Sequence, residues 1–414
     1  MLTAEEIKLE AQALKSELFE IYKDLHQHPE SSWEEFRTAK IVEDYLRALG
    51  LEVQTGVGYN GVVGVLDTGR PGKTLLLRAD MDALLMDDLC GLPYQSENPG
   101  ICHSCGHDSH VAMLLGAAKV LSAHKDEFSG RIKFAFQACE ENTFNKEIRR
   151  KVADAGYTGR PEAGLGGARA MVQDGVLEGV DACMAIHVAA EIPIGTIKIR
   201  KDQACASTDF FEITLIGKGG HGSAPHLVID PVPAMAELVQ AIHMLPTREI
   251  NALETTVFHI GDIHTPGSTA SSVADRVVIK GGFRAFRDET RSVLSKRIKE
   301  LTYRIAEAWK CTVEYEFHCG YSPTINDADL SAKVADSCTK VLGGDNVFYT
   351  EAPSLTAEDF SEFARLRPSV YMNLGVAVGE DYPILHNPRF HVSADALPFG
   401  VEVHVQNTLD YLNS

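Results

Sequence analysis

The most constraining feature of this 414-residue chain is a cluster of cysteine and histidine side chains within ten residues. The segment Ile101–His110 reads ICHSCGHDSH, and an apolar helix pattern over 111–123 follows it at once. Thiolates and imidazoles are good ligands for zinc-like ions. The Cys105-x-His107 spacing is not that of a zinc finger, which would need a second Cys/His pair at a fixed distance. The chain must therefore fold so that distant residues complete the site, as in an enzyme.

Hydrophobic periodicity predicts an α/β fold, in which a three-layer catalytic domain has a central mixed sheet. Strand patterns lie at 51–55, 62–67, 74–80, 131–137, 182–187 and 369–374. Helix patterns lie at 3–25, 31–49, 166–175, 327–342, 358–366 and 395–412. For the second of these helices we expect a capping box between Ser32 and Glu35.

The middle of the chain has a different order of elements. Strand patterns at 209–217, 255–263, 276–286 and 312–318 alternate with helix patterns at 230–245 and 288–309. This β-α-β-β-α-β order is that of a ferredoxin-like α+β unit. We therefore expect an inserted lid at 203–319, between the two parts of the catalytic domain at 1–202 and 320–414.

Composition narrows the class of partner and the compartment. The formal net charge of -19 argues against nucleic acid and anionic membrane surfaces as partners. No run approaches the ~20 apolar residues of a membrane span, and residues 1–25 do not resemble a signal peptide. The nine cysteines are an odd number and do not suggest a disulfide framework. We expect a cytoplasmic protein.

Ligand-type side chains follow the predicted strands of the first domain. They are Asp80, Asp82, Cys105, His107, Glu140, Glu141, His187 and the late-loop residue His386. A doubly wound sheet brings such strand ends to one edge. Together they suit two divalent ions that polarise a carbonyl and activate water. Neighbouring carboxylates in an extended chain point in different directions, so one of Glu140 and Glu141 would bind metal and the other act as general base.

Each residue alone has a plainer interpretation. Asp80 is compatible with a turn or helix cap, and a Glu-Glu pair is usually solvated. Cys102 and Cys139 suit buried apolar positions, and His187 suits a core histidine. The prediction of a metal site depends on the joint pattern, because residues of these kinds have no structural reason to share strand ends.

Six ordered motifs resemble the aminoacylase-like amidohydrolases, which include hippurate, N-acetyl-amino-acid and auxin-conjugate hydrolases within the carboxypeptidase and aminoacylase superfamily. The resemblance covers nearly the whole chain. The motifs are Leu25–Glu30, Arg78–Leu84, Cys105–Asp108, Phe136–Glu141, Gly217–His226 and Glu358–Phe360.

The resemblance implies a role for each matching residue. The metal ligands would be Cys105, His107, Glu141, His187 and His386. Glu140 would be the general base, and Asp80 would orient one of the ligands without binding the metal itself. The lid would contribute His221 to catalysis, in some relatives across a dimer, and Arg284 as a clamp for the substrate carboxylate. His226 would assist in binding or serve only as a turn histidine.

The chain departs from the family pattern at three places. Ala138-Cys139 replaces a usual Pro-Ala, and 142–165 forms an insertion with a basic cluster beside the Glu-Glu pair. In the lid, Ser272 stands near the position of a substrate-contacting asparagine, so substrate positioning by Ser272 is open.

We therefore expect a metal-dependent amidohydrolase that cleaves N-acyl amino acids and forms a homodimer or higher homo-oligomer through its lid. The cofactors would be two divalent ions per chain, Zn²⁺ or Mn²⁺, with Co²⁺ or Ni²⁺ also suited to mixed sulfur, nitrogen and oxygen ligands. The alternatives are a dipeptidase or carboxypeptidase of the same superfamily, a thiol hydrolase with Cys105 as nucleophile, and a non-catalytic binding protein.

Overall fold

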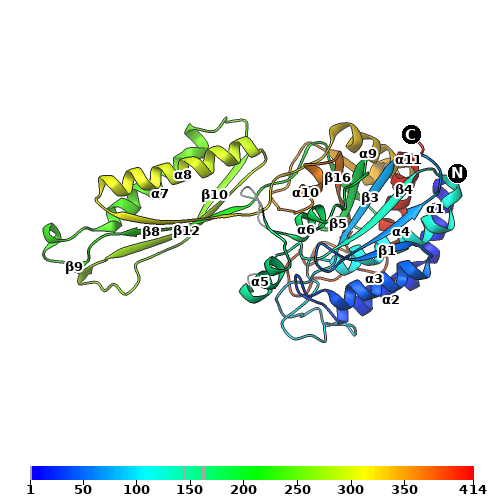
Figure 1. The fold of residues 1–414 in the computed structure, drawn as a ribbon, viewed down its shortest axis with the longest axis horizontal. Helices are drawn as coiled ribbons and strands as arrows, with labels where there is room; N and C mark the ends of the chain where they lie inside the picture. Colours follow the sequence, from blue (N-terminus) through cyan, green and yellow to red (C-terminus); the bar gives the residue numbers. More distant parts are fainter. Residues whose placement is uncertain (1, 143–144, 160–164) are drawn as a thin grey trace.

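The structure is a computed structural model that describes residues 2–142, 145–159 and 165–414. Figure 1 shows an elongated molecule with a large α/β body on one side and a slender lid on the other. Both chain termini lie together on the α/β body, on the side away from the lid (Figure 1). None of the described helices is both long and apolar enough to cross a membrane.

The α/β body is built on an eight-stranded mixed sheet. Its spatial order is β1 (Glu52–Val57), β2 (Gly61–Asp67), β4 (Arg131–Gln137), β3 (Thr74–Asp80), β5 (Ala182–Pro193), β16 (Ser369–Ala377), β6 (Ile197–Arg200) and β15 (Val347–Thr350). The four neighbours β4, β3, β5 and β16 are parallel to one another, whereas β2 and β6 pair antiparallel to this group. The carboxyl ends of the four parallel strands therefore share one edge.

Helices cover both faces of this sheet, which confirms the three-layer prediction. One face packs against α1 (Ala4–Ala13), α2 (Lys15–Gln27), α3 (Phe36–Ala48), α4 (His107–Ala123), α9 (Ala328–Leu342) and α11 (Leu397–Leu412). The other carries the shorter α6 (Gly167–Gln173) and α10 (Ser361–Ala364). Leu75 and Leu77 enter the core beneath the first layer and Leu76 enters the second core, as the two-residue period of a strand requires.

The lid is a four-stranded antiparallel sheet with two helices on one face. The chain order is β8 (Asp209–Ile216), α7 (Pro231–Arg248), β10 (Thr256–His264), β12 (Arg276–Ala285), α8 (Asp288–Ala308) and β13 (Thr312–Cys319). The spatial order is β10-β12-β8-β13, and the lid has a hydrophobic core of its own. This confirms the predicted ferredoxin-like unit. The domain boundaries at 202/203 and 319/320 stay a prediction.

Two chain segments join the lid to the α/β body. Thr208 N in one segment donates to Tyr321 O in the other at 3.1 Å, and Ser207 N donates to Ala285 O at the end of lid strand β12 at 2.7 Å. The short strands β7 (Gln203–Cys205) and β14 (Thr324–Ile325) pair beside this crossing. Arg291 on α8 anchors the base of the lid, because its buried guanidinium donates to both oxygens of Asp209 at 2.6 and 2.7 Å.

Several local predictions were wrong. The helix expected at 3–25 is two helices, and that expected at 358–366 is only α10. The capping box is absent: α3 begins at Phe36, and the Ser32 hydroxyl donates to Asp82 instead. The strand expected to end at His187 continues to Pro193, because β16 pairs with it beyond that residue. In the last two cases a tertiary contact outweighs the local pattern.

Candidate metal centre

The proposed ligands converge at the carboxyl edge of the parallel strands. Asp80 ends β3 and pairs with Gln137 of β4, so Glu140 and Glu141 follow β4 at the same edge. The pairing of Arg78 with Ala185 in β5 places His187 level with Asp80. His187 thus belongs to this edge although its strand runs past it.

A glycine turn delivers the Cys105 and His107 side chains to this edge. Gly106 adopts φ +84° and caps α4, which begins at His107. A Cβ atom at this position would lie 2.5 Å from the Val188 side chain on β5. Glycine is therefore required both for the left-handed backbone and for the close approach to β5.

Two histidines are held by one ring nitrogen and present the other to the centre. His107 Nδ1 donates to the Asp82 carbonyl at 2.8 Å, and its buried Nε2 has no hydrogen-bond partner among the described residues. His187 Nδ1 donates to the Val188 carbonyl at 2.7 Å, while its Nε2 lies 3.4 Å from Cys105 Sγ. A backbone acceptor fixes the tautomer in both rings, so each Nε2 carries a lone pair suited to a metal.

The remaining donors complete a compact group. Cys105, His107 and Glu141 offer ligand atoms within 4.8 Å of one another. Glu141 Oε1 also lies 3.0 Å from His386 Nε2, and the His386 side chain is 52% exposed. The structure therefore brings all five predicted ligands to one place, with His386 on the open side.

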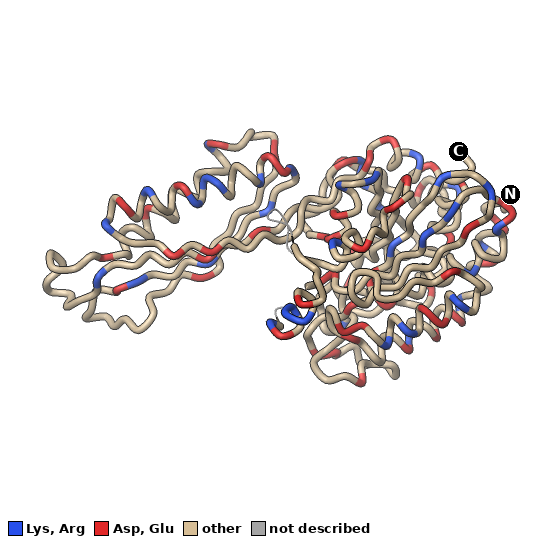
Figure 2. Tube along the Cα trace, in the orientation of Figure 1, with Lys and Arg blue, Asp and Glu red and all other residues tan. Residues whose placement is uncertain are grey.

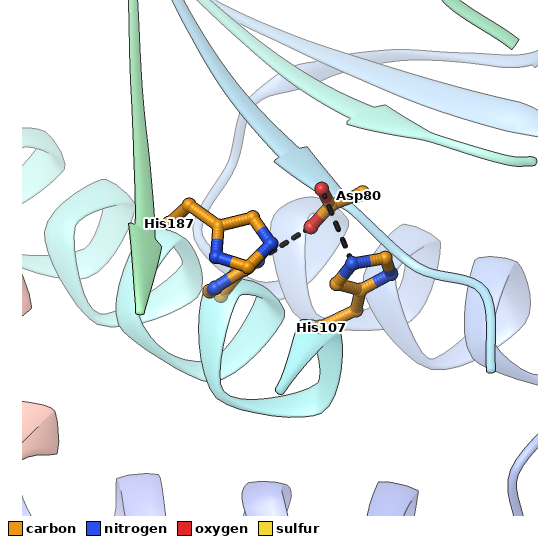
Figure 3. A group of neighbouring side chains, drawn as sticks. Asp80, His107 and His187 are labelled. Atoms are coloured by element: carbon orange, nitrogen blue, oxygen red, sulfur yellow. Dashed lines mark hydrogen bonds and ion pairs between the residues drawn. The ribbon is translucent and has the colours of Figure 1, made fainter. Parts of the chain in front are cut away.

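Asp80 faces the centre between the two histidines. Figure 3 shows its carboxylate at the end of β3, pointing between His107 and His187. Its Oδ2 lies 3.6 Å from His107 Nε2 and accepts from Arg78 at 2.6 Å. Its Oδ1 accepts from His110 Nδ1 at 2.5 Å. Asp80 thus lies on the Nε2 side of the His107 ring, whereas Asp82 contacts Nδ1 and orients the ring.

The family resemblance assigned no role to Asp82, but its carboxylate contacts several residues of the centre. Its Oδ1 accepts from Glu140 N at 3.0 Å and lies 3.2 Å from His107 Nδ1. Its Oδ2 accepts from Glu141 N at 3.0 Å and from Ser32 Oγ at 2.6 Å. One buried carboxylate therefore fixes both glutamates and a histidine. The Asp-x-Asp pattern signals a pair of carboxylates but not which one does this.

The electrostatic field of the centre favours a cation. Against the effect of burial, the carboxylates of Asp80 and Asp82 raise the pKa of His107 to about 10. Burial, followed by the charge of Glu141, raises the pKa of the Cys105 thiol well above its usual range. A field that holds a proton on imidazole and disfavours a thiolate is one that a divalent ion would neutralise. The Nε2 atom of His107, which has no hydrogen-bond partner among the described residues, would also suit such an ion.

Glu140 lies beside the centre in an acidic, buried environment. Burial, followed by the carboxylate of Glu358, raises its pKa well above the usual range. Arg78 partly compensates this charge, because its buried guanidinium donates to Asp80, to Glu358 at 2.9 Å and to Asp359 at 3.1 Å. An arginine inside an otherwise apolar strand was the sequence signal for this network.

Comparison with known proteins agrees with this geometry. The family model for Peptidase family M20/M25/M40 matches residues 76–409. The chain belongs to this family. Thermostable carboxypeptidase 2 of Saccharolobus solfataricus is 34% identical over 99% of both chains, and IAA-amino acid hydrolase ILR1-like 2 of Arabidopsis thaliana is 32% identical over 95% of this chain and 85% of its own. The crystal structure of the Bacillus subtilis YXEP protein, described as a dinuclear metal binding peptidase, superposes with a TM-score of 0.79 at 24% identity over 97% and 99% of the chains.

Membership in this family confirms the suspected resemblance and the prediction of a hydrolase. The relatives named as hydrolases argue against the alternative of a non-catalytic binding protein on this fold. The mixed α/β body with its inserted lid is the architecture expected for the family. The roles of individual residues are a separate question, which depends on the geometry.

The predicted lid residues lie in two places. Arg284 is at the base of the lid, half-buried, where its guanidinium donates to the Leu355 carbonyl at 2.8 Å. His221 and Ser272 pair with each other in the two-stranded sheet of β9 (Gly220–His221) and β11 (Ser272–Val273). Figure 1 places β9 at the tip of the lid farthest from the α/β body. His226, five residues after His221, is also exposed. Within one chain the tip residues do not reach the centre.

The insertion after Glu141 contains one helix, α5 (Lys146–Asp154), near the lid junction (Figure 1). Ile148 and Val152 bury one side of it. Its basic residues are exposed, and the trace at the place of α5 is largely blue in Figure 2; these residues are Lys146, Arg149, Arg150 and Lys151. Residues 143–144 and 160–164 of the predicted insertion lie outside the described residues.

Proposed function

We propose that this protein is a metal-dependent amidohydrolase that cleaves the amide bond of N-acyl amino acids, such as hippurate-like, N-acetyl or aryl-acyl conjugates. One observation carries the proposal: five donor side chains from distant segments converge beside a buried glutamate at one sheet edge. The products would be a carboxylate and a free amino acid.

Cys105, His107, Glu141, His187 and His386 would hold two divalent ions, Zn²⁺ or Mn²⁺. Such ions polarise the scissile carbonyl and lower the pKa of water. Asp82 keeps His107 in the tautomer that offers Nε2. The Val188 carbonyl does the same for His187. These contacts support the ligand assignment, because metal-binding histidines typically donate their second nitrogen to such acceptors.

Glu140 would act as general base and then as general acid. Burial raises its pKa, which favours taking a proton from the attacking water and giving it to the leaving nitrogen. Asp82 restrains the backbone of Glu140 and of Glu141, so that the two side chains keep different directions and different tasks.

The lid would bind the amino-acid part of the substrate. Arg284 suits the α-carboxylate, because a guanidinium forms paired hydrogen bonds with a carboxylate and this one lies at the domain junction. Since His221 is at the far tip of its own lid, it would serve the centre of a second copy in a homodimer. Ser272 and His226 would accompany it there.

Two competing activities have specific support. The similarity to a relative named as a carboxypeptidase supports peptide substrates for this protein. In that case the centre would bind a peptide in the place of the acyl group. The 3.4 Å contact between Cys105 and His187 would suit a thiol hydrolase with His187, rather than His107, as base. A thiol enzyme keeps its activity in EDTA and loses it to iodoacetamide.

The first experiment is a metal count joined to an activity assay. Protein purified without chelator should carry up to two metal ions per chain and release amino acid from N-acetyl, N-benzoyl or indole-acetyl conjugates. EDTA should abolish release, and zinc or manganese should restore it. Matching dipeptides in the same assay distinguish an acylase from a peptidase. Full activity after complete metal removal would contradict the proposal.

We also propose a cytoplasmic location. Cys105, Cys139 and Cys338 are buried as free thiols, which is in line with a reducing environment such as the cytoplasm.

A further inference from the structure

The turn that carries Glu140 begins with an unfavourable backbone conformation. Cys139 adopts φ +50°, in the left-handed region that residues with a Cβ rarely occupy. Its side chain is fully buried, and its carbonyl accepts from Gly167 N at 2.9 Å. Such a conformation persists only where its surroundings enforce it.

A carboxylate from a distant segment enforces this bend. Glu35, in the loop before α3, is fully buried, and its Oε1 accepts from Cys139 N at 2.7 Å and from Trp33 N at 3.0 Å. Its Oε2 accepts from the Asn60 amide at 2.6 Å. All three donors are neutral, although a carboxylate is costly to bury. The placement therefore needs a reason beyond packing.

Glu35 and Asp82 share the turn between them. The backbone N–H of Cys139 donates to Glu35, and the next two N–H groups, of Glu140 and Glu141, donate to Asp82. Three consecutive N–H groups are thus held by two buried carboxylates. We propose that Glu35 is a positioning residue for Glu140: its hydrogen bond to Cys139 holds the left-handed bend and so aims the base. This inference rests on the proposed role of Glu140.

The choice of substitution separates geometry from charge. In Glu35→Gln the side-chain oxygen still reaches Cys139 N, and the new amide can donate to Asn60 Oδ1, which has no hydrogen-bond partner in the described structure, if the Asn60 amide flips. Glu35→Asp keeps the carboxyl group but withdraws the acceptor by one methylene. Positioning therefore predicts that the glutamine variant turns over within about threefold of wild type and that the aspartate variant loses about 10- to 100-fold in kcat.

A loss in kcat with unchanged KM and unchanged metal content would be the signature of a misplaced base. Glu35→Ala should lose as much as the aspartate variant if it folds. Adding Cys139→Gly to it should recover part of kcat while lowering stability further, because glycine adopts φ +50° without help but leaves a cavity. The neighbouring Glu34→Gln is the matched control, since Glu34 is exposed and its side chain accepts from Ser31 Oγ within that loop at 2.7 Å.

The experiment consists of steady-state kinetics, metal content and circular dichroism on wild type, Glu140→Gln, Glu35→Gln, Glu35→Asp and the Glu34→Gln control. An inactive Glu140→Gln with metal bound and a slow Glu35→Asp beside a fast Glu35→Gln would support the inference. An aspartate variant as fast as the glutamine variant, with Glu140→Gln inactive, would overturn the inference alone. An active Glu140→Gln would overturn the proposed role of the base itself.

Discussion

Replacing Asp82 with asparagine removes one buried negative charge while keeping the shape of the side chain. The carboxylate accepts from Glu140 N, Glu141 N and Ser32 Oγ and lies 3.2 Å from His107 Nδ1. Asparagine offers one oxygen and one NH₂ group in the same places. Whichever way the amide turns, its NH₂ group meets the backbone N–H of one of the two glutamates.

The size of the effect follows from these contacts. An unbonded buried N–H costs about 1–3 kcal/mol, and the bond that remains loses the assistance of a charge, worth about another 1 kcal/mol. The sum, about 2–4 kcal/mol, corresponds to a loss of about 30- to 1,000-fold in kcat/KM at 1.36 kcal/mol per factor of ten. The Ser32 hydroxyl can turn to accept and adds little.

The assay is kcat/KM on the best N-acyl amino acid, with metal content measured on the same sample. Asp67→Asn is the matched control, because Asp67 is an exposed carboxylate that also accepts from a backbone N–H, that of Gly69, and should change kcat/KM less than twofold. An Asp82→Asn enzyme within threefold of wild type, with full metal, would refute the view that this carboxylate fixes the centre.

Two further predictions concern stability and assembly. Glu402 on α11 is 2% exposed, and burial raises its pKa from 4.5 to about 7, so the folded state holds a proton that the unfolded state releases between these pH values. The free energy of unfolding should therefore fall as pH rises through this window. In urea unfolding, Glu402→Gln should raise it by about 2 kcal/mol at pH 8 and by almost nothing at pH 4. An equal gain at both pH values would be inconsistent with titration of Glu402. If His221 acts in the centre of the partner chain in a dimer, mixing His221→Ala with Glu140→Gln chains should restore about 25% of wild-type activity. Half of the dimers would then contain one chain of each kind, and one of the two centres in each of these dimers would have both residues intact. If the subunits are shown to exchange and the mixture stays inactive, His221 does not take part in catalysis in the partner's centre.

Much of the fold could be predicted because local patterns and chain order carry it. The apolar runs of strands such as 74–80 and the β-α-β-β-α-β order of the lid are both found in the structure. The same local rules failed where a distant group competes. Ser32 bonds to Asp82 rather than capping a helix, and the strand at His187 extends because β16 offers it a partner. Neither competitor is visible in the neighbouring sequence.

The amino-acid sequence specifies which side chains could form the centre. The donor types lie at strand ends and turns, and parallel strands bring such ends to one edge; they are Cys105, His107, Glu141, His187 and His386. The orientation of these side chains follows from the folded structure alone. Asp80 and Asp82 lie two residues apart and are alike in sequence, yet one faces the free nitrogen of His107 and the other its back. The distance of His221 from the centre of its own chain is likewise a property of the folded lid, because the way one body is set against another depends on contacts that no local pattern encodes.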